Sequence, residues 1–294
     1  SAAAPSPANF AGPAADGLPD DGARQVTLDN GTLYANGVPV VIKKDGDGQK
    51  AVYDADGAIK LMDAPNLTTV YGGGKNADVD GDTSVTVEDL SLTVYGGGYS
   101  DGTHSANVSG DAYICVTGTQ VVHTYGGGYA IGQNGEAFAN VAGTVRSDIL
   151  AQVPRPEEGY TKNGHDIVGG GYASSQRYAA HATVGDAFTK SGEPIHVIRG
   201  GGYAVSAQGK TADASAGAVA MTLLNGDIRE VYGAGYASGA NAVADAESVY
   251  ITGDQTEVSV TLRGGGTATG SGRASVRGLA KIELKNQSRI LSYL

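Results

Sequence analysis

The sequence predicts an all-β protein, a single-stranded parallel β-helix (β-solenoid) with about seven coils, three short strands per coil and an N-terminal β cap. Three observations support this fold class. A glycine triplet returns about every thirty residues, short segments of alternating apolar and polar residues fill the intervals, and the position two residues before each triplet is almost always apolar. Such a repeat is typical of a solenoid rather than of a globular enzyme core.

The glycine triplets mark the individual coils. They begin at Gly72, Gly96, Gly126, Gly169, Gly200, Gly233 and Gly264, and the sixth reads Gly233-Ala234-Gly235. Glycine permits close approach of a neighbouring backbone and dihedral angles that a β-branched residue excludes. We therefore expect each triplet to turn the chain at a corner between two sheets, and the stacked coils to place the triplets in one line.

The residues around the triplets predict which side chains point into the solenoid. An inward column is expected two positions before the triplets, at Val70, Val94, Thr124, Ile167, Ile198, Val231 and Leu262. The mixed set directly before the triplets, Tyr71, Tyr95, Tyr125, Val168, Arg199, Tyr232 and Arg263, is expected on the surface. After most triplets a tyrosine is expected to face outward and the following alanine inward. Alternation of this kind places successive side chains on opposite faces of a strand.

The chain divides into three parts. Residues 1–23 are rich in Ala and Pro and are expected to be a disordered leader, either a spacer behind a removed signal or an ordinary disordered terminus. Residues 24–65 are expected to form capping β segments, including a hairpin at Asn36-Gly37, where both residues tolerate positive φ. Residues 66–294 carry the repeats, with insertions at 153–164, 189–194 and 253–257 expected along one edge.

Composition excludes several classes of partner. The chain of 294 residues has 31 acidic and 20 basic side chains, a formal charge of -11, so nucleic acid is not expected as a partner. A run of 18 apolar residues is absent, so membrane insertion is not expected either. Cys115 is the single cysteine, which excludes an intrachain disulfide and a metal site of several thiolates. We expect Cys115 to face outward beside Tyr113.

Tyrosines are the strongest candidates for a binding surface. Tyr95, Tyr99, Tyr125, Tyr129, Tyr172, Tyr203, Tyr232 and Tyr236 are expected to line two sides of the glycine strip. Their apolar rings and hydroxyl groups suit sugar rings. Alternatively, tyrosines one coil apart stack on each other as a ladder that needs no ligand, which the regularity of the repeat favours.

An acidic run between the first two triplets resembles a calcium loop. Its oxygen ligands are expected at Asp78, Asp80 and Asp82, followed by Ser84, Thr86 and Asp89. The match is imperfect because Thr83 stands at the sixth place, where such loops have glycine, and no flanking helix is visible. The alternative is that these residues are the outward positions between inward Ala77, Val79, Val85 and Val87, without calcium or any other cofactor.

Catalytic signatures are weak. A glycosidase or lyase needs carboxylates, or a carboxylate with Arg or Lys, converging from adjacent coils, and no such column repeats. Asp166 with Asp186, or Glu157 and Glu158 with Arg155, are the pairs that could meet across coils. The five histidines show no ligand spacing and fit exposed strand positions. The sequence also lacks a G-x-S-x-G element and a phosphate-binding loop, so we do not expect an enzyme.

The repeated V-Y-G-G-G-Y-A followed by A-x-V-x-G strands, from Val70 to Leu294, resembles the right-handed parallel β-helix repeats of large surface proteins from Gram-positive, often gut-dwelling bacteria. It looks like the pectin lyase-like architecture in adhesin form. The resemblance implies an extracellular or surface-displayed structural or adhesive solenoid, with host or cell-wall glycans or a surface protein as partner. A polysaccharide lyase or glycoside hydrolase near residues 154–164, and a passive spacer of a larger surface protein, are the alternatives. The acidic cluster and catalytic arginine of the lyases have no assignable match here.

Overall fold

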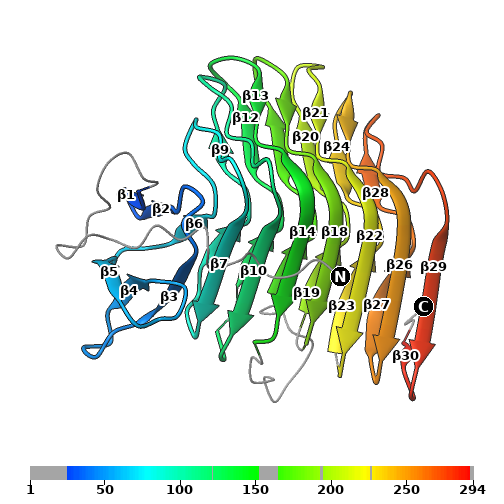
Figure 1. The fold of residues 1–294 in the computed structure, drawn as a ribbon. Coiled ribbons are helices and arrows are strands. Elements are labelled where there is room, and N and C mark those ends of the chain that lie inside the picture. The colour runs from blue at the N-terminus through cyan, green and yellow to red at the C-terminus, as the bar shows by residue number, and fades with distance from the viewer. Residues whose placement is uncertain (1–24, 121, 152–164, 193–194, 226, 292–294) are drawn as a thin grey trace.

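The computed structural model describes residues 25–120, 122–151, 165–192, 195–225 and 227–291, which form β-strands in four sheets (Figure 1). Within these ranges there is no helix, and hence none that could cross a membrane. Strands of successive coils pair in parallel and build a solenoid of about six turns. The prediction of an all-β parallel solenoid is confirmed. The expected leader and the insertion at 153–164 lie outside the described residues.

Two sheets of ten strands form the longer walls. Sheet A contains, in order, β1 (Thr27–Asp29), β2 (Thr32–Tyr34), β6 (Thr69–Tyr71), β8 (Thr93–Tyr95), β11 (His123–Tyr125), β15 (His165–Val168), β19 (Ile195–Arg199), β23 (Asp227–Tyr232), β27 (Glu257–Arg263) and β30 (Arg289–Ile290). Sheet B contains, in order, β5 (Lys60–Asp63), β4 (Lys50–Tyr53), β3 (Val40–Lys44), β7 (Thr83–Glu88), β10 (Ala112–Thr117), β14 (Val141–Ile149), β18 (Val184–Ser191), β22 (Ala216–Leu224), β26 (Ala246–Asp254) and β29 (Ala280–Lys285).

Two smaller sheets complete the cross-section. Sheet C contains β9 (Tyr99–Ser100), β12 (Tyr129–Gly132), β16 (Tyr172–Ser175), β20 (Tyr203–Ser206), β24 (Tyr236–Ser238) and β28 (Thr267–Thr269). Sheet D contains β13 (Ala137–Phe138), β17 (Ala180–His181), β21 (Ala212–Asp213) and β25 (Ala242–Val243). A middle coil therefore has a fourth strand beyond the three expected. The strands of sheet D have two residues each, too few for alternation to reveal them in the sequence.

The N-terminal residues extend sheets A and B. β2 pairs in parallel with β6, and β3 pairs in parallel with β7, while β1–β2 and β3–β4–β5 pair antiparallel. The expected hairpin at Asn36-Gly37 is wrong. Both residues have positive φ, 52° and 80°, but the strands on either side enter different sheets, and Gly37 N donates to Gly72 O (2.9 Å). The same turn chemistry thus makes the first corner, against the first glycine triplet.

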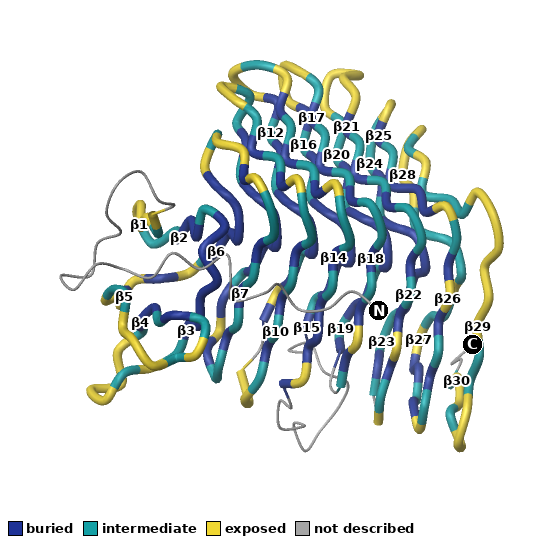
Figure 2. The backbone as a smooth tube through the Cα atoms, in the orientation of Figure 1, coloured by how far each residue is buried: buried dark blue, intermediate teal, exposed yellow. Residues whose placement is uncertain are grey.

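Aliphatic side chains fill the interior in aligned columns. The inward column is confirmed: Val70, Val94, Thr124, Ile167, Ile198 and Val231 are fully buried, and Leu262, in the last triplet's coil, is partly buried. A second cluster consists of alanines, including Ala130, Ala173, Ala204 and Ala237. Ala77, expected inward, is exposed because it belongs to the first coil of this region and only one side of it is covered. In Figure 2 the buried segments run along the inside of the stacked coils.

Close backbone packing explains the glycine triplets. A Cβ atom on Gly73 would lie 2.6 Å from the nitrogen of Gly98, and one on Gly127 would lie 2.8 Å from the Cα of Gly171. The middle residues also bond from coil to coil, with Gly97 N donating to Gly127 O at 3.1 Å. None of the triplet glycines has positive φ, so close approach, and not a left-handed conformation, requires glycine here.

The last described coil leaves apolar residues uncovered. Ile282 pairs in register with the buried Ile251 but is 39% exposed, and Leu279 is 71% exposed. Figure 2 shows β29 largely exposed at this end. Ile282 continues the inward column of the preceding coils and is exposed because no described coil packs on it, whereas Leu279 lies one position before Ala280, the partner of the buried Val249, and is outside that column.

Candidate functional site

Tyrosines of sheet A form a stacked column beside the glycine corner. The ring centroids of Tyr34 and Tyr71 lie 5.3 Å apart, those of Tyr71 and Tyr95 4.6 Å, and those of Tyr95 and Tyr125 4.7 Å, with the rings within about 10° of parallel. Parallel pairing in register holds each ring above the ring of the previous coil. The alternative of an aromatic ladder is confirmed for these residues.

Tyrosines of sheet C form a second column across the corner. Tyr99, Tyr129 and Tyr172 meet edge to face, with centroids 5.6 and 4.7 Å apart. Tyr172, Tyr203 and Tyr236 are stacked, with centroids 5.0 and 4.5 Å apart. We call the two columns together the tyrosine seam. It consists of Tyr34, Tyr71, Tyr95 and Tyr125 on sheet A and Tyr99, Tyr129, Tyr172, Tyr203 and Tyr236 on sheet C.

The two columns of the tyrosine seam touch each other. Centroid distances are 5.7 Å for Tyr71 and Tyr99 and 5.8 Å for Tyr95 and Tyr129. Outward side chains diverge at a corner that is convex toward solvent, so contact between them shows that the glycine corner is concave on its outer side. The seam therefore fills a re-entrant angle of the solenoid.

This packing corrects the expectation that the column before the triplets is a surface. Tyr71 is 4% and Tyr95 7% exposed, because the rings of sheet C cover them. Burial raises the pKa of the Tyr95 hydroxyl well above its ordinary value, and it raises the pKa values of Tyr125 and Tyr129 to about 12. The N-terminal half of the seam is thus a small outer core.

The C-terminal half of the seam is more accessible. Tyr172, Tyr203 and Tyr236 are half-buried. Their ring faces are largely taken up by stacking, so edges and hydroxyl groups are what they offer to a ligand. A hydrogen bond with Thr269 is the chief cause that lowers the pKa of Tyr236. Tyr232 is 9% exposed, and its hydroxyl donates to Glu230 at 2.9 Å.

The guanidinium group of Arg199 lies among the rings of Tyr203, Tyr232 and Tyr236. In register it stands between Val168 and Tyr232 on sheet A. Its Cζ atom is 5.9, 5.4 and 5.6 Å from the ring centroids of Tyr203, Tyr232 and Tyr236. Sequence reasoning placed Arg199 in the mixed surface column and did not single it out. The sequence did contain a signal for it, because Arg199 is a positively charged residue in a column that consists mainly of tyrosines.

The acidic run binds the next coil. Asp78 Oδ1 accepts from Asn107 N (2.7 Å), and in the following coils Asn107 accepts from Asn140 N and Asn140 from Thr183 N. Asp78 is therefore the first member of a polar ladder at the variable place of the A-x-V pattern. Its members are Asp78, Asn107, Asn140, Thr183, Ser215, Asp245 and Ser275.

Asp80 and Asp82, the other two carboxylates at the start of the predicted calcium loop, have similar partners. Ser109 Oγ donates to Asp80 (2.9 Å), and Asp111 N donates to Asp82 (2.8 Å). Across the described residues no three His, Cys, Asp or Glu side chains are grouped to hold a metal ion. The three carboxylates thus have a structural role in joining coils, and calcium binding at them stays a prediction.

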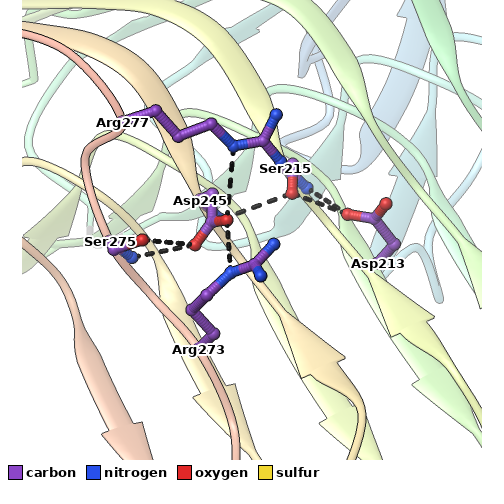
Figure 3. A network of polar contacts seen from close by, with 6 residues as sticks. All are labelled: Asp213, Ser215, Asp245, Arg273, Ser275 and Arg277. Carbon is purple, nitrogen blue, oxygen red and sulfur yellow. Dashed lines mark hydrogen bonds and ion pairs between the residues drawn. The ribbon is translucent and has the colours of Figure 1, made fainter.

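Asp245 is the most buried member of the polar ladder (Figure 3). It is 1% exposed and accepts from Ser275 N (2.9 Å), Ser275 Oγ (3.0 Å) and Arg273 Nε (2.6 Å), while Arg277 Nε lies 3.5 Å away. Ser215 Oγ accepts from Asp245 N on the other side (3.3 Å). The network ties three coils together at the corner between sheets D and B.

A shallow groove of about 450 Å³ follows this corner. Gly143, Gly185 and Gly217 line it, together with Asp186, Glu247, Arg277 and neighbouring residues. A Cβ atom on Gly185 would lie 2.5 Å from Gly143 O, so glycine is again required by coil stacking. The A-x-V-x-G pattern contains Gly143 at its last place, but the sequence did not predict that these glycines line a groove.

A chain of polar side chains crosses the outer face of sheet A. Asp166 lies 3.3 Å from His123 Nδ1 and 2.8 Å from His196 Nδ1, and Arg229 donates to His196 Nε2 (2.9 Å). Since Arg229 can only donate, His196 carries its proton on Nδ1. The suggested pairing of Asp166 with Asp186 is wrong, because these residues lie on sheets A and B. Glu157, Glu158 and Arg155 lie outside the described residues.

Burial shifts the pKa values of two further side chains, His165 and Cys115. His165 is fully buried, accepts from Val122 N (3.1 Å) and lies 3.4 Å from Ala151 O, and burial lowers its pKa. This differs from the exposed position expected for histidines. Cys115 lies on the outer face of sheet B beside Tyr113, as expected, and burial raises the pKa of its thiol, which disfavours the nucleophilic thiolate.

Comparison with known protein families, with characterised proteins and with solved structures found no match. The functional hypothesis below therefore depends on the sequence and geometry of this chain.

Proposed function

We propose that this protein is a structural and adhesive β-solenoid, displayed outside the cell on a Gram-positive surface, that binds glycans along the C-terminal half of the tyrosine seam. The observation that carries the proposal is the row of Tyr172, Tyr203 and Tyr236. These side chains stand one coil apart, half-buried, in a concave corner of the solenoid. Phenol edges and hydroxyl groups at regular spacing suit a linear, hydroxyl-rich chain.

The rest of the molecule supports a scaffold role. Buried aliphatic columns, the glycine corners and the polar ladder all connect each coil to the next, so the outer face keeps a fixed geometry. A rigid platform reduces the entropy lost when a ligand binds. The resemblance of the repeat to surface-protein solenoids supports display outside the cell.

Glycan-array binding with purified protein tests the proposal. We expect a defined set of oligosaccharides to bind, and the double substitution Tyr203→Ala and Tyr236→Ala to abolish that binding. Tyr178→Ala is the matched control, because Tyr178 is 48% exposed and takes no part in the seam. Release of shortened products would support a polysaccharide-cleaving enzyme instead. Absence of both binding and cleavage would favour a passive spacer.

A further inference from the structure

The environment of Arg199, which lies beside the tyrosine seam, indicates the charge of the ligand. Arg199 is half-buried, and its Nε atom is buried without a hydrogen-bond partner. Its guanidinium contacts are the rings of Tyr203, Tyr232 and Tyr236. Stacking on aromatic rings stabilises the cation and fixes the direction of its N–H groups, but it supplies no acceptor oxygen.

Several other arginines in the described part of the chain have carboxylate partners within 4 Å. Arg273 and Arg289 bind Asp245 and Glu257. Glu230, which lies on the strand next to Arg199, accepts from the Tyr232 hydroxyl (2.9 Å) and faces Arg229 Nε at 3.7 Å. The carboxylate close to Arg199 is therefore already engaged.

We propose that Arg199 selects an anionic glycan, one that carries carboxylate or sulfate groups, for the C-terminal half of the tyrosine seam. This inference rests on the proposed glycan-binding function and specifies its ligand class. A guanidinium presents N–H groups in a planar fork that matches carboxylate and sulfate oxygens. An anionic oxygen that reaches the accessible part of the guanidinium neutralises a cation that is partly removed from water.

The coil after next provides a second cation along the same column. Arg263 is in register with Tyr232, which is in register with Arg199. Arg263 is exposed and follows two coils after Arg199. Two guanidinium groups with a tyrosine between them suit a polymer whose charged groups alternate with neutral sugars.

Calorimetric titration with three hexasaccharides tests the inference. The probes are hyaluronan, which is carboxylated, chondroitin sulfate, which is carboxylated and sulfated, and neutral cellohexaose. We expect the anionic probes to bind more tightly, and Arg199→Gln to weaken their binding roughly tenfold to a hundredfold without affecting cellohexaose. Arg177→Gln is the control, since Arg177 is exposed and outside the seam. Thermal melting of each variant verifies folding.

The outcomes separate this inference from the proposed function. Equal binding of the neutral and anionic probes, or anionic binding that Arg199→Gln leaves unchanged, overturns the inference while glycan binding stands. Binding of none of the probes, with an empty glycan array, overturns both. Preference for chondroitin sulfate over hyaluronan identifies sulfate as the recognised group, and equal affinity for the two identifies carboxylate.

Discussion

The glycine triplets give the sharpest prediction about stability. Replacing Gly127 by alanine places a Cβ atom 2.8 Å from the Cα and N atoms of Gly171 and from Val184 Cγ1. Two of these atoms are backbone of the next coil, so relief requires the coils to separate locally. Overpacking of this kind costs about 1–3 kcal/mol. The matched control is Gly265→Ala, at the same middle position of the last triplet, where nothing lies within 4 Å of the added atom.

Denaturant unfolding of the two variants measures the difference. We expect Gly127→Ala to lower the free energy of unfolding by about 1–3 kcal/mol, which corresponds to a melting midpoint lower by roughly 2–12 °C for a chain of this size. Gly265→Ala is expected to change the free energy by less than about 0.5 kcal/mol. Equal losses for the two substitutions would refute close coil packing as the reason for glycine.

Three further predictions concern buried groups. Asp245→Ala removes a buried acceptor that bonds Ser275 and Arg273, and it is expected to destabilise the fold by about 1–3 kcal/mol, more than Asp78→Ala at the exposed start of the ladder; chemical denaturation ranks the two variants. Burial lowers the pKa of His165 below 6.5, so the folded state is least penalised above pH 6.5 and loses stability as the pH falls below that value. His165→Gln should therefore reduce the loss of melting temperature at acidic pH. The pKa of His123 is raised by its hydrogen bond to a carboxylate, so its contribution to stability instead grows as the pH falls. Tyr95→Ala is expected to cost about 3–5 kcal/mol and Tyr95→Phe less than about 1 kcal/mol, and similar losses in unfolding experiments would contradict ring packing as the role of Tyr95.

The repeating features of the fold were predictable from the sequence. Val94 and Ile198 occupy the inward column that the triplet spacing placed them in, and both are fully buried. Parallel stacking multiplies a local preference over every coil, so a weak single-residue signal becomes a strong one. The turn residues Asn36 and Gly37 were correctly given positive φ, but local chemistry does not determine which sheets the flanking strands join.

The candidate site was predictable only in part. Tyrosines were found by their repetition, but the burial of Tyr71 and Tyr95 depends on the concave corner, which brings a second column over them. Arginine occupies two of the seven places in the column of Arg199, and aspartate two of the seven places in the polar ladder, so repetition does not single out Arg199 or Asp245. Their significance comes from contacts between coils about thirty residues apart, and these contacts appear only in three dimensions.

The most direct test of the solenoid uses its single cysteine. Cys115 on β10 is in register with Thr86 on β7, with both side chains on the outer face of sheet B, and the same row reaches Thr252 on β26 four coils further on. Neighbouring coils lie about 4.8 Å apart, so Thr252 is roughly 19 Å from Cys115. Dibromobimane, which fluoresces when it bridges two nearby thiols, should therefore link Cys115 in Thr86→Cys but not in Thr252→Cys. Fluorescence in the second variant, or none in the first, would contradict the stacking of coils in register.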